Sequence, residues 1–206
     1  MTEVILFDLF GVIARDQSPE AVHALTTVAG FAAPAFLDAY WRHRAPYDRG
    51  TVTAGEYWQG VAAELGITFD ADRIRALIAA DMASWEAVDE QMVDLIEQIA
   101  ATGVRLALLS NIPADLAAFY EQHHHRWLRR FEIVAFSCRI GLAKPDPRAF
   151  RWCCDTLGVT PEQVLFIDDR AENIHAAERL GLHTHQFTGL AGLNELRKLS
   201  AWTTSE

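Results

Sequence analysis

The sequence predicts an α/β protein: a Rossmann-like doubly wound parallel sheet with an inserted helical cap domain. Four short apolar runs alternate with helical patterns along the chain. Each run is apolar at nearly every position, which is typical of parallel strands that helices cover on both faces. Between the first run and the next, residues 14 to 86 show helical spacing and no convincing strand, and this segment is too long for a connecting loop.

The strands are predicted where the apolar runs lie. These runs are VILFD at residues 4 to 8, VRLALLS at 104 to 110, IVAFS at 133 to 137 and VLFID at 164 to 168. From residue 88 onward the strand–helix–strand pattern recurs to the end of the chain.

Helix ends are marked by capping residues and glycines. Three segments offer an N-cap followed by proline, namely Ser18-Pro19-Glu20, Asp146-Pro147 and Thr160-Pro161-Glu162. Four glycines follow helical segments, where a left-handed closing residue is favoured: Gly30, Gly103, Gly158 and Gly181. The last three of these glycines each stand near the start of a new strand.

The chain is therefore expected to form two domains. Residues 1–15 and 85–206 make the Rossmann-like core, and residues 16–84 make the helical cap. No repeat, low-complexity tract or flexible linker separates them, so we expect the two domains to pack closely.

Composition excludes several classes of partner. The net charge of the 206-residue chain is -10, which argues against a nucleic acid or an anionic membrane as partner because both would be repelled. The N-terminus carries no secretory leader and no long apolar run is present, so we expect a cytoplasmic protein. The three cysteines, Cys138, Cys153 and Cys154, lack metal-ligand spacing and are expected to be reduced.

The candidate site residues all follow predicted strands. They are Asp8 after the first strand, Ser110 and Asn111 after the second, Lys144 in the loop after the third, and Asp168 and Asp169 at the end of the fourth. Carboxyl ends of parallel strands meet at one edge of the sheet, where such folds bind their ligands. Each signal alone is weak, since Ser-Asn also turns a chain and paired aspartates also cap helices.

Together these residues suit phosphoryl transfer. Three converging carboxylates repel one another unless a divalent cation neutralises them, and carboxylate oxygens suit Mg²⁺. Lys144 and the Ser110 hydroxyl would add a positive charge and a donor for a bound phosphoryl group. Asp8 is then the natural nucleophile, which would form an aspartyl-phosphate.

Four segments in this order resemble the motifs of the haloacid dehalogenase superfamily of hydrolases: FDLFGV, LLSN, GLAKPDPRAF and VLFIDDRAENI. The resemblance implies that Asp8 is the nucleophile, that Ser110 and Asn111 bind the transferring group, and that Lys144 bridges nucleophile and phosphate. It also implies that Mg²⁺ is bound by Asp8, the Phe10 carbonyl and Asp169, with Asp168 close by. The insert is similar to the cap that selects substrates in sugar-phosphate phosphatases, so the expected substrate is a small phosphorylated metabolite, a sugar phosphate among the candidates.

One residue departs from the phosphatase pattern. Related phosphatases carry an aspartate two residues after the nucleophile as general acid and base, and Phe10 occupies that position here. Family dehalogenases carry an aromatic residue there, so a 2-haloacid dehalogenase and a weakly active binding or regulatory member remain alternatives. The tandem Asp168 and Asp169 favour the metal-dependent phosphatase, because dehalogenases of the family use no Mg²⁺ and without a metal these carboxylates would be unneutralised.

Three further polar features lie outside these motifs. Arg49, in the segment YDRG of the cap, could hold a substrate anion or pair with a surface acid. The triplet HHH at residues 123 to 125 reads as a solvated helix end, because consecutive helix positions cannot all face one ion. Asp16 is close enough in sequence to Asp8 to reach the mouth of the site, but the sequence assigns it no role. The sequence also leaves the oligomeric state open.

Overall fold

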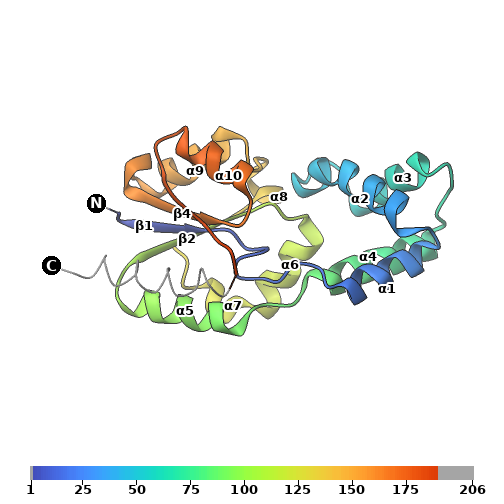
Figure 1. Cartoon of the computed structure of the whole chain (residues 1–206), viewed down its shortest axis with the longest axis horizontal. Helices are drawn as coiled ribbons and strands as arrows, with labels where there is room; N and C mark the ends of the chain where they lie inside the picture. The colour runs from blue at the N-terminus through green and yellow to red at the C-terminus, as the bar shows by residue number, and fades with distance from the viewer. Residues whose placement is uncertain (1, 190–206) are drawn as a thin grey trace.

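A five-stranded parallel sheet forms the centre of the core (Figure 1). The computed structural model describes residues 2–189. Its strands are β1 (Val4–Phe7), β2 (Arg105–Ser110), β3 (Ile133–Phe136), β4 (Val164–Asp168) and β5 (His183–Gln186), in the order β3-β2-β1-β4-β5. All four strand pairings are parallel, which confirms the predicted fold class.

Helices cover both faces of the sheet (Figure 1). One layer contains α5 (Glu90–Ala101), α6 (Ala114–His123) and α7 (His125–Leu128), and the other contains α9 (Pro147–Leu157) and α10 (Ala171–Glu178). Alternate residues of β1 enter different apolar cores: Ile5 and Phe7 pack on the first layer, Val4 and Leu6 on the second. This double burial explains why the strand sequences are apolar at every position.

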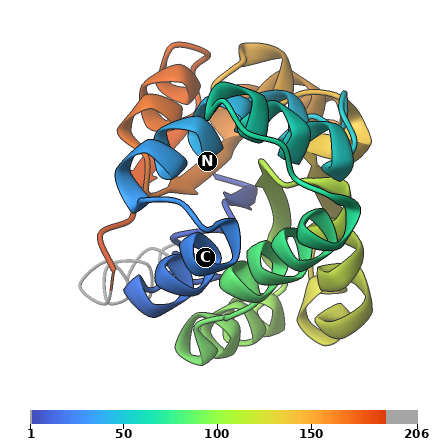
Figure 2. The ribbon, with the colours of Figure 1, turned by 90° about the vertical axis from the view of Figure 1, so that its right-hand side faces the viewer.

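Four helices outside the sheet form the inserted segment (Figure 2). They are α1 (Pro19–Ala29), α2 (Ala33–Asp48), α3 (Ala54–Glu64) and α4 (Ala71–Trp85). They bury an apolar core of their own, which includes Leu25, Phe36, Trp58 and Leu77. We refer to these four helices as the cap.

Two of the three predicted N-caps begin α-helices. The Ser18 hydroxyl accepts a hydrogen bond from the Ala21 N–H at the start of α1, and Asp146 caps α9 through the Arg148 N–H. The third, Thr160, begins a single 3₁₀ turn over Pro161–Gln163, because β4 begins directly at residue 164. No single helix within residues 2–189 is long and apolar enough to cross a membrane; α1 and α2 reach that length and composition only together, bent by 93°.

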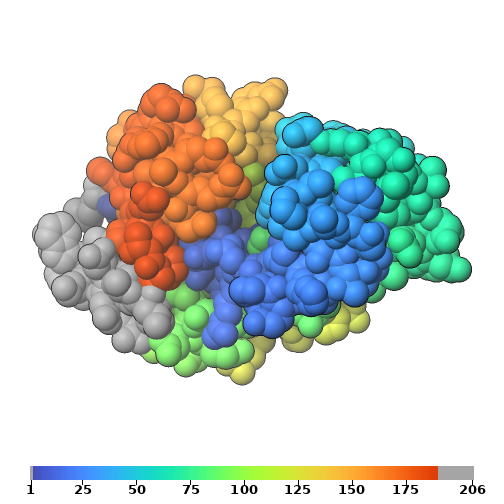
Figure 3. All heavy atoms as spheres, turned by 45° about the vertical axis from the view of Figure 1, so that its right-hand side comes forward, coloured from blue at the N-terminus to red at the C-terminus, as the bar shows by residue number. Residues whose placement is uncertain are grey.

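The end of α2 lies against the core. Ser137, the first residue of α8 (Ser137–Ile140), donates its hydroxyl to the Asp48 carbonyl of the cap and accepts from the Ile112 N–H of the core. Gly50 adopts a φ of 69°, and a Cβ there would lie 2.9 Å from the Cys138 carbonyl oxygen, so this close approach requires glycine. Figure 3 shows the cap beside the core, with a hollow between them.

Candidate active site

Asp8 lies at the carboxyl edge of the sheet, directly after β1. Its backbone N–H donates to the Ile167 carbonyl of β4, and its Oδ1 accepts from the Leu9 N–H at 2.6 Å. The side chain is only 8% exposed. Burial raises the pKa of the Asp8 carboxyl, the Lys144 ammonium lowers it, and Asp168 raises it again, so that the net shift is upward.

Lys144 bridges two of the predicted carboxylates. Its Nζ lies 2.6 Å from Asp8 Oδ1 and 2.7 Å from Asp168 Oδ2, and its side chain is 1% exposed. Burial alone would lower the pKa of this ammonium, but the two carboxylates outweigh it and the pKa is raised. Lys144 is therefore a fixed positive charge beside the candidate nucleophile.

Asp168 is fully engaged by protein donors. Besides Lys144, it accepts hydrogen bonds from Asn173 Nδ2, 3.0 Å from each carboxylate oxygen, and from the Arg170 N–H. Burial raises its pKa, but these donors, Lys144 first, reverse the shift and lower it. Asp168 is thus an ionised group that holds Lys144 in place.

Asp169 is the carboxylate with a spare ligand atom. Its Oδ1 is buried and has no hydrogen-bond partner within the described part of the chain. Burial and the neighbouring charges of Asp168 and Asp16 raise its pKa to about 6. Gly11 has a φ of 78°, and a Cβ there would lie 2.6 Å from Asp169 Oδ2, so glycine is required for Asp169 to pack here.

These carboxylates fit a divalent cation. Asp8, Asp168 and Asp169 each offer an oxygen, and the three oxygens lie within 4.8 Å of one another. The Phe10 carbonyl, beside them in the chain, accepts no hydrogen bond from residues 2–189. Asp8, Asp169 and the Phe10 carbonyl are the oxygen set best suited to Mg²⁺, because Asp168 already serves Lys144.

Asn111 and Ser110 occupy different environments. The Asn111 amide forms two 2.8 Å hydrogen bonds with the backbone of Lys144, one to its carbonyl and one from its N–H. Its side chain therefore positions the Lys144 loop. Ser110 is fully buried, and its hydroxyl has no partner in the part of the chain that the structure describes. An unpartnered buried hydroxyl fits the donor role expected of Ser110.

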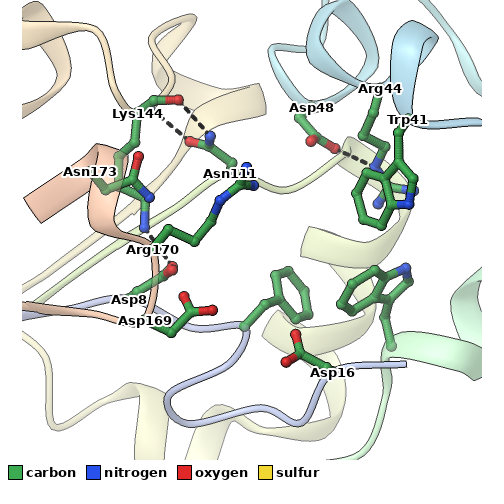
Figure 4. A pocket seen from close by; sticks show the side chains of 12 residues that line it. Asp8, Asp16, Trp41, Arg44, Asp48, Asn111, Lys144, Asp169, Arg170 and Asn173 are labelled. Carbon is green, nitrogen blue, oxygen red and sulfur yellow. Dashed lines mark hydrogen bonds and ion pairs between the residues drawn. The ribbon is translucent and has the colours of Figure 1, made fainter. Parts of the chain in front are cut away.

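The cap contributes a second buried charge cluster, which the sequence did not reveal. Arg44 lies between Asp48, with 2.8 Å from Nε to Oδ1, and Asp81, with 3.0 Å from Nη1 to Oδ2. The Tyr40 hydroxyl donates to Asp81 and accepts from Arg44 and from the Trp85 indole N–H. Arg44, Asp48 and Trp85 line the cavity above Asp8 (Figure 4).

Aromatic side chains line the same cavity. Phe10 packs edge-on against Trp85 with ring centroids 5.0 Å apart, and Trp85 meets Trp41 at 6.1 Å. Asp16, which the sequence left without a role, also lines the cavity, as does Arg170 (Figure 4).

The remaining expectations lie away from this cavity. Arg49 is exposed on an adjoining cleft between cap and core, and no acid among residues 2–189 forms an ion pair with it. The histidines at 123 to 125 end α6 and begin α7, and belong to no cluster of metal-binding groups in the described region. The three cysteines are free.

Sequence comparison identifies relatives along most of the chain. The model of a hydrolase family, the haloacid dehalogenase-like hydrolases, matches residues 2–181. A sesquiterpene phosphatase of Aspergillus oryzae is 29% identical over 112 residues, which are 54% of this chain and 57% of that protein. A validoxylamine A 7'-phosphate phosphatase of Streptomyces hygroscopicus subsp. limoneus is 25% identical over 96% of this chain and 94% of that protein.

Some relatives are longer proteins or have other activities. Mouse acyl-CoA dehydrogenase family member 10 is 35% identical over 97 residues, 45% of this chain but only 8% of that protein. The chain therefore spans less than two thirds of the first curated relatives it matches. An (S)-2-haloacid dehalogenase of Burkholderia cepacia is 29% identical over 100 residues, 44% of this chain and 39% of that protein.

Solved structures share the fold. A haloacid dehalogenase family enzyme of Bacteroides thetaiotaomicron, in complex with magnesium, superposes with a TM-score of 0.78 at 20% identity, covering 96% of this chain and 98% of that one. An L-2-haloacid dehalogenase of Xanthobacter autotrophicus with covalently bound chloropropionic acid gives 0.69 at 18% identity, covering 100% and 85%.

Proposed function

Because the chain belongs to the haloacid dehalogenase-like hydrolase family, we propose that it is a Mg²⁺-dependent phosphatase that acts through an aspartyl-phosphate. The substrate is a small phosphorylated metabolite, with sugar phosphates the first class to test, and the enzyme acts in the cytoplasm. Residues 1–15 and 85–206 are the hydrolase core, and residues 16–84 are a cap that selects the substrate.

One observation carries this proposal: a buried, unpartnered oxygen of Asp169 beside the paired Asp8 and Lys144. Three carboxylates share this edge of the sheet and face one ammonium. The excess negative charge and the raised pKa of Asp169 are what a bound cation would relieve. A purely structural cluster has no need of a third carboxylate with a free oxygen.

Asp8 is assigned as the nucleophile. Its carboxylate oxygen attacks phosphorus, the bond from phosphorus to the ester oxygen breaks, and the leaving group departs with the electron pair of that bond. Water then attacks the phosphorus of the aspartyl-phosphate, the bond from phosphorus to the Asp8 oxygen breaks, and inorganic phosphate leaves with the Asp8 carboxylate restored. Lys144 orients the Asp8 carboxylate and offsets charge on the phosphoryl oxygens, while Asp168 and Asn111 hold Lys144 at that place.

The remaining contacts follow from the free donors and ligands. When bound by Asp8, Asp169 and the Phe10 carbonyl, Mg²⁺ supplies positive charge to the phosphoryl oxygens. The Ser110 hydroxyl and the Asn111 backbone N–H bind the transferring group. Arg49 lies on the cleft beside the cavity, where it would hold a second anionic group of the substrate.

A hydrolysis screen tests the proposal. Phosphorylated metabolites and 2-haloacids are incubated with the protein, each with Mg²⁺ and with a chelator. Phosphate release that needs Mg²⁺ and disappears in Asp169→Asn is the expected result. Phosphate release that survives both chelation and Asp169→Asn excludes the metal-dependent reaction, and silence on every compound favours a binding or regulatory role.

The second candidate, a 2-haloacid dehalogenase, is favoured by one feature. Phe10 and Trp85 make the cavity wall next to Asp8 apolar, which suits a carbon–halogen bond that departs without a proton. Halide release in the presence of chelator, with no phosphate release from any ester, would establish this candidate. Asp169 argues against it, because a metal-free reaction leaves that carboxylate uncompensated.

A further inference from the structure

Three aromatic side chains form a continuous surface from the nucleophile to the cavity opening. Phe10 stands two residues after Asp8, Trp85 packs against Phe10, and Trp41 packs against Trp85. All three line the cavity that contains Asp8 and Lys144. We call Phe10, Trp85 and Trp41 the aromatic wall.

The inner part of the wall is held firmly. Trp85 is 7% exposed, and its indole N–H donates to the buried Tyr40 hydroxyl at 3.0 Å. Phe10 also packs edge-on against Tyr120, with ring centroids 5.8 Å apart. These contacts mean that a ligand meets a preformed surface and does not have to order it first.

The outer part of the wall is unusually open. Within residues 2–189, Trp41 is the one large hydrophobic side chain that is exposed, at 49%. Its neighbours Tyr40 and Trp85 meet it at interplanar angles of 88° and 83°. A half-exposed indole on a cavity that also contains a nucleophile is a surface on which a flat apolar group can stack.

The wall lies on the side of the leaving group. In-line attack by Asp8 places the leaving oxygen opposite Asp8, and therefore towards the cap. Figure 4 shows Trp41, Arg44 and Asp48 facing the floor of the cavity from the cap side. Both the stacking surface and the polar pair formed by Arg44 and Asp48 thus face the organic part of the ester.

The chemistry of the wall adds a second constraint. Phe10, Trp85 and Trp41 have no proton to give to a departing oxygen, so oxygens that leave readily as anions are favoured there. Phenolic oxygens are such groups, since a phenol of the tyrosine type has a pKa of about 10, far below that of an aliphatic alcohol. Shape and proton chemistry therefore favour the same kind of leaving group.

We infer that the preferred substrates are phosphate monoesters of aromatic hydroxyl compounds, whose ring stacks on Trp41 while Asp8 attacks the phosphorus. This inference rests on the proposed phosphatase function and sharpens its substrate class. An aliphatic or sugar leaving group would use the polar pair but would gain less from the wall.

Three esters separate the ring from the acidity of its oxygen. Benzyl and cyclohexylmethyl phosphate have leaving alcohols of similar acidity and size, but only the first carries an aromatic ring. Phenyl phosphate keeps the ring and has the more acidic oxygen. With Mg²⁺, we expect kcat/KM to fall in the order phenyl, benzyl, cyclohexylmethyl, and glucose 6-phosphate to rank below benzyl phosphate.

Substitutions of Trp41 test the stacking surface. Trp41→Ala should lower kcat/KM for benzyl phosphate about 3- to 10-fold and change that for cyclohexylmethyl phosphate less than about twofold. Trp41→Phe should restore most of the loss. Trp152→Phe on α9, at a position that lines neither this cavity nor the adjoining cleft, is the control and should change neither value.

The outcomes distinguish this inference from the proposed function. If phosphate is released from all esters but benzyl does not exceed cyclohexylmethyl, or if Trp41→Ala lowers both equally, the inference is wrong and the phosphatase stands. If no ester releases phosphate in the presence of Mg²⁺, both fall.

Discussion

The core and the cap each place a buried cation between two carboxylates on the cavity, the core at its floor and the cap at its roof, but the two clusters differ in how far their charges are balanced. In the core, Lys144 lies between Asp8 and Asp168, and in the cap, Arg44 lies between Asp48 and Asp81. Both cations are buried and lie within 3.0 Å of two carboxylates. The core has in addition the uncompensated Asp169, whereas the cap has the Tyr40 hydroxyl, which hydrogen-bonds to Asp81, Arg44 and Trp85.

This difference in charge balance suggests a ligand-binding role for the core cluster and a structural role for the cap cluster. The core cluster sets three carboxylates against one ammonium and leaves an Asp169 oxygen without a partner among the described residues, a surplus of negative charge that a cation would neutralise. The cap cluster satisfies its members internally and thereby fixes the helices that carry Trp41 and Trp85. Replacing a central residue should therefore abolish turnover in the core and loosen the structure in the cap.

The largest effect is expected at Asp8, the proposed nucleophile. Asp8→Asn should lower kcat by at least about 10⁴-fold, because an amide oxygen attacks phosphorus poorly. Inorganic phosphate and Mg²⁺ should still bind, as measured by isothermal titration calorimetry. Asp94→Asn, at an exposed position on α5, is the control and should retain full activity. Turnover close to wild type in Asp8→Asn would rule out the aspartyl-phosphate.

The second prediction concerns the removal of each buried cation, Arg44 in the cap and Lys144 in the core. Arg44→Met leaves Asp48 and Asp81 buried without their cation and should lower the free energy of unfolding by about 3–5 kcal/mol, as measured by urea denaturation. Arg42, on the same helix as Arg44, forms an exposed pair with Glu64 of α3, so Arg42→Met is the control and should cost less than about 1 kcal/mol.

Lys144→Met completes this comparison. It should also destabilise the protein, but Mg²⁺ should recover part of that loss because the ion can neutralise the core carboxylates. Mg²⁺ should recover none of the loss in Arg44→Met. Equal recovery in both variants would contradict the distinction between the two clusters.

The candidate site residues of the core could be predicted from the sequence because they lie at the ends of strands that the apolar runs predict. Strands β1, β2 and β4 end at Phe7, Ser110 and Asp168. The polar residues at and directly after these ends converge because the carboxyl ends of parallel strands share one edge of the sheet. The helical turn after Thr160 is short for a simple reason. A capping sequence signals where a turn begins, but the number of residues before the next strand decides whether a helix can follow.

The cap cluster could not be predicted from the sequence, because its residues lie on helices and not at strand ends. Arg44, Asp48 and Asp81 come from two helices of the insert, α2 and α4, and a charged residue on a helix looks the same whether it faces solvent or a partner. The Asn111 side chain shows the same limit: its role depends on the backbone of Lys144, 33 residues away. The hydrophobic stripe of α2 is interrupted because one of its buried positions is the charged Arg44.

A third prediction concerns Phe10, where floor and roof meet. Phe10→Asp places a carboxyl group beside the leaving oxygen and should raise kcat for alkyl phosphates by about 10²-fold, the lower end of general-acid catalysis. Aryl phosphates should gain much less, since they need no proton. Phe10→Asn has the same shape without the acid and serves as control.

The result has an informative contrary outcome. If Phe10→Asp changes neither class of ester while chemistry limits the rate, another group already supplies the proton. Asp16 and Asp48 are carboxyl groups that line the same cavity, and Asn substitution at each would identify the one that supplies the proton.

The smallest expected effect is a dependence of stability on pH that arises at Asp169 in the core cluster. The raised pKa of Asp169, about 6, means that the folded protein binds a proton there more tightly than the unfolded chain, whose carboxyl titrates near 3.8. With chelator present, stability should therefore be higher at low pH and fall as the pH rises from about 4 to about 6, because the native state must then carry an unfavourable charge. The raised pKa of Asp8 acts in the same direction. Asp169→Asn should flatten this slope in thermal unfolding, and saturating Mg²⁺ should do the same in the wild type by accepting the charge. A slope that persists unchanged in Asp169→Asn would place its origin at another group. The core cluster would then carry no more uncompensated negative charge than the cap cluster.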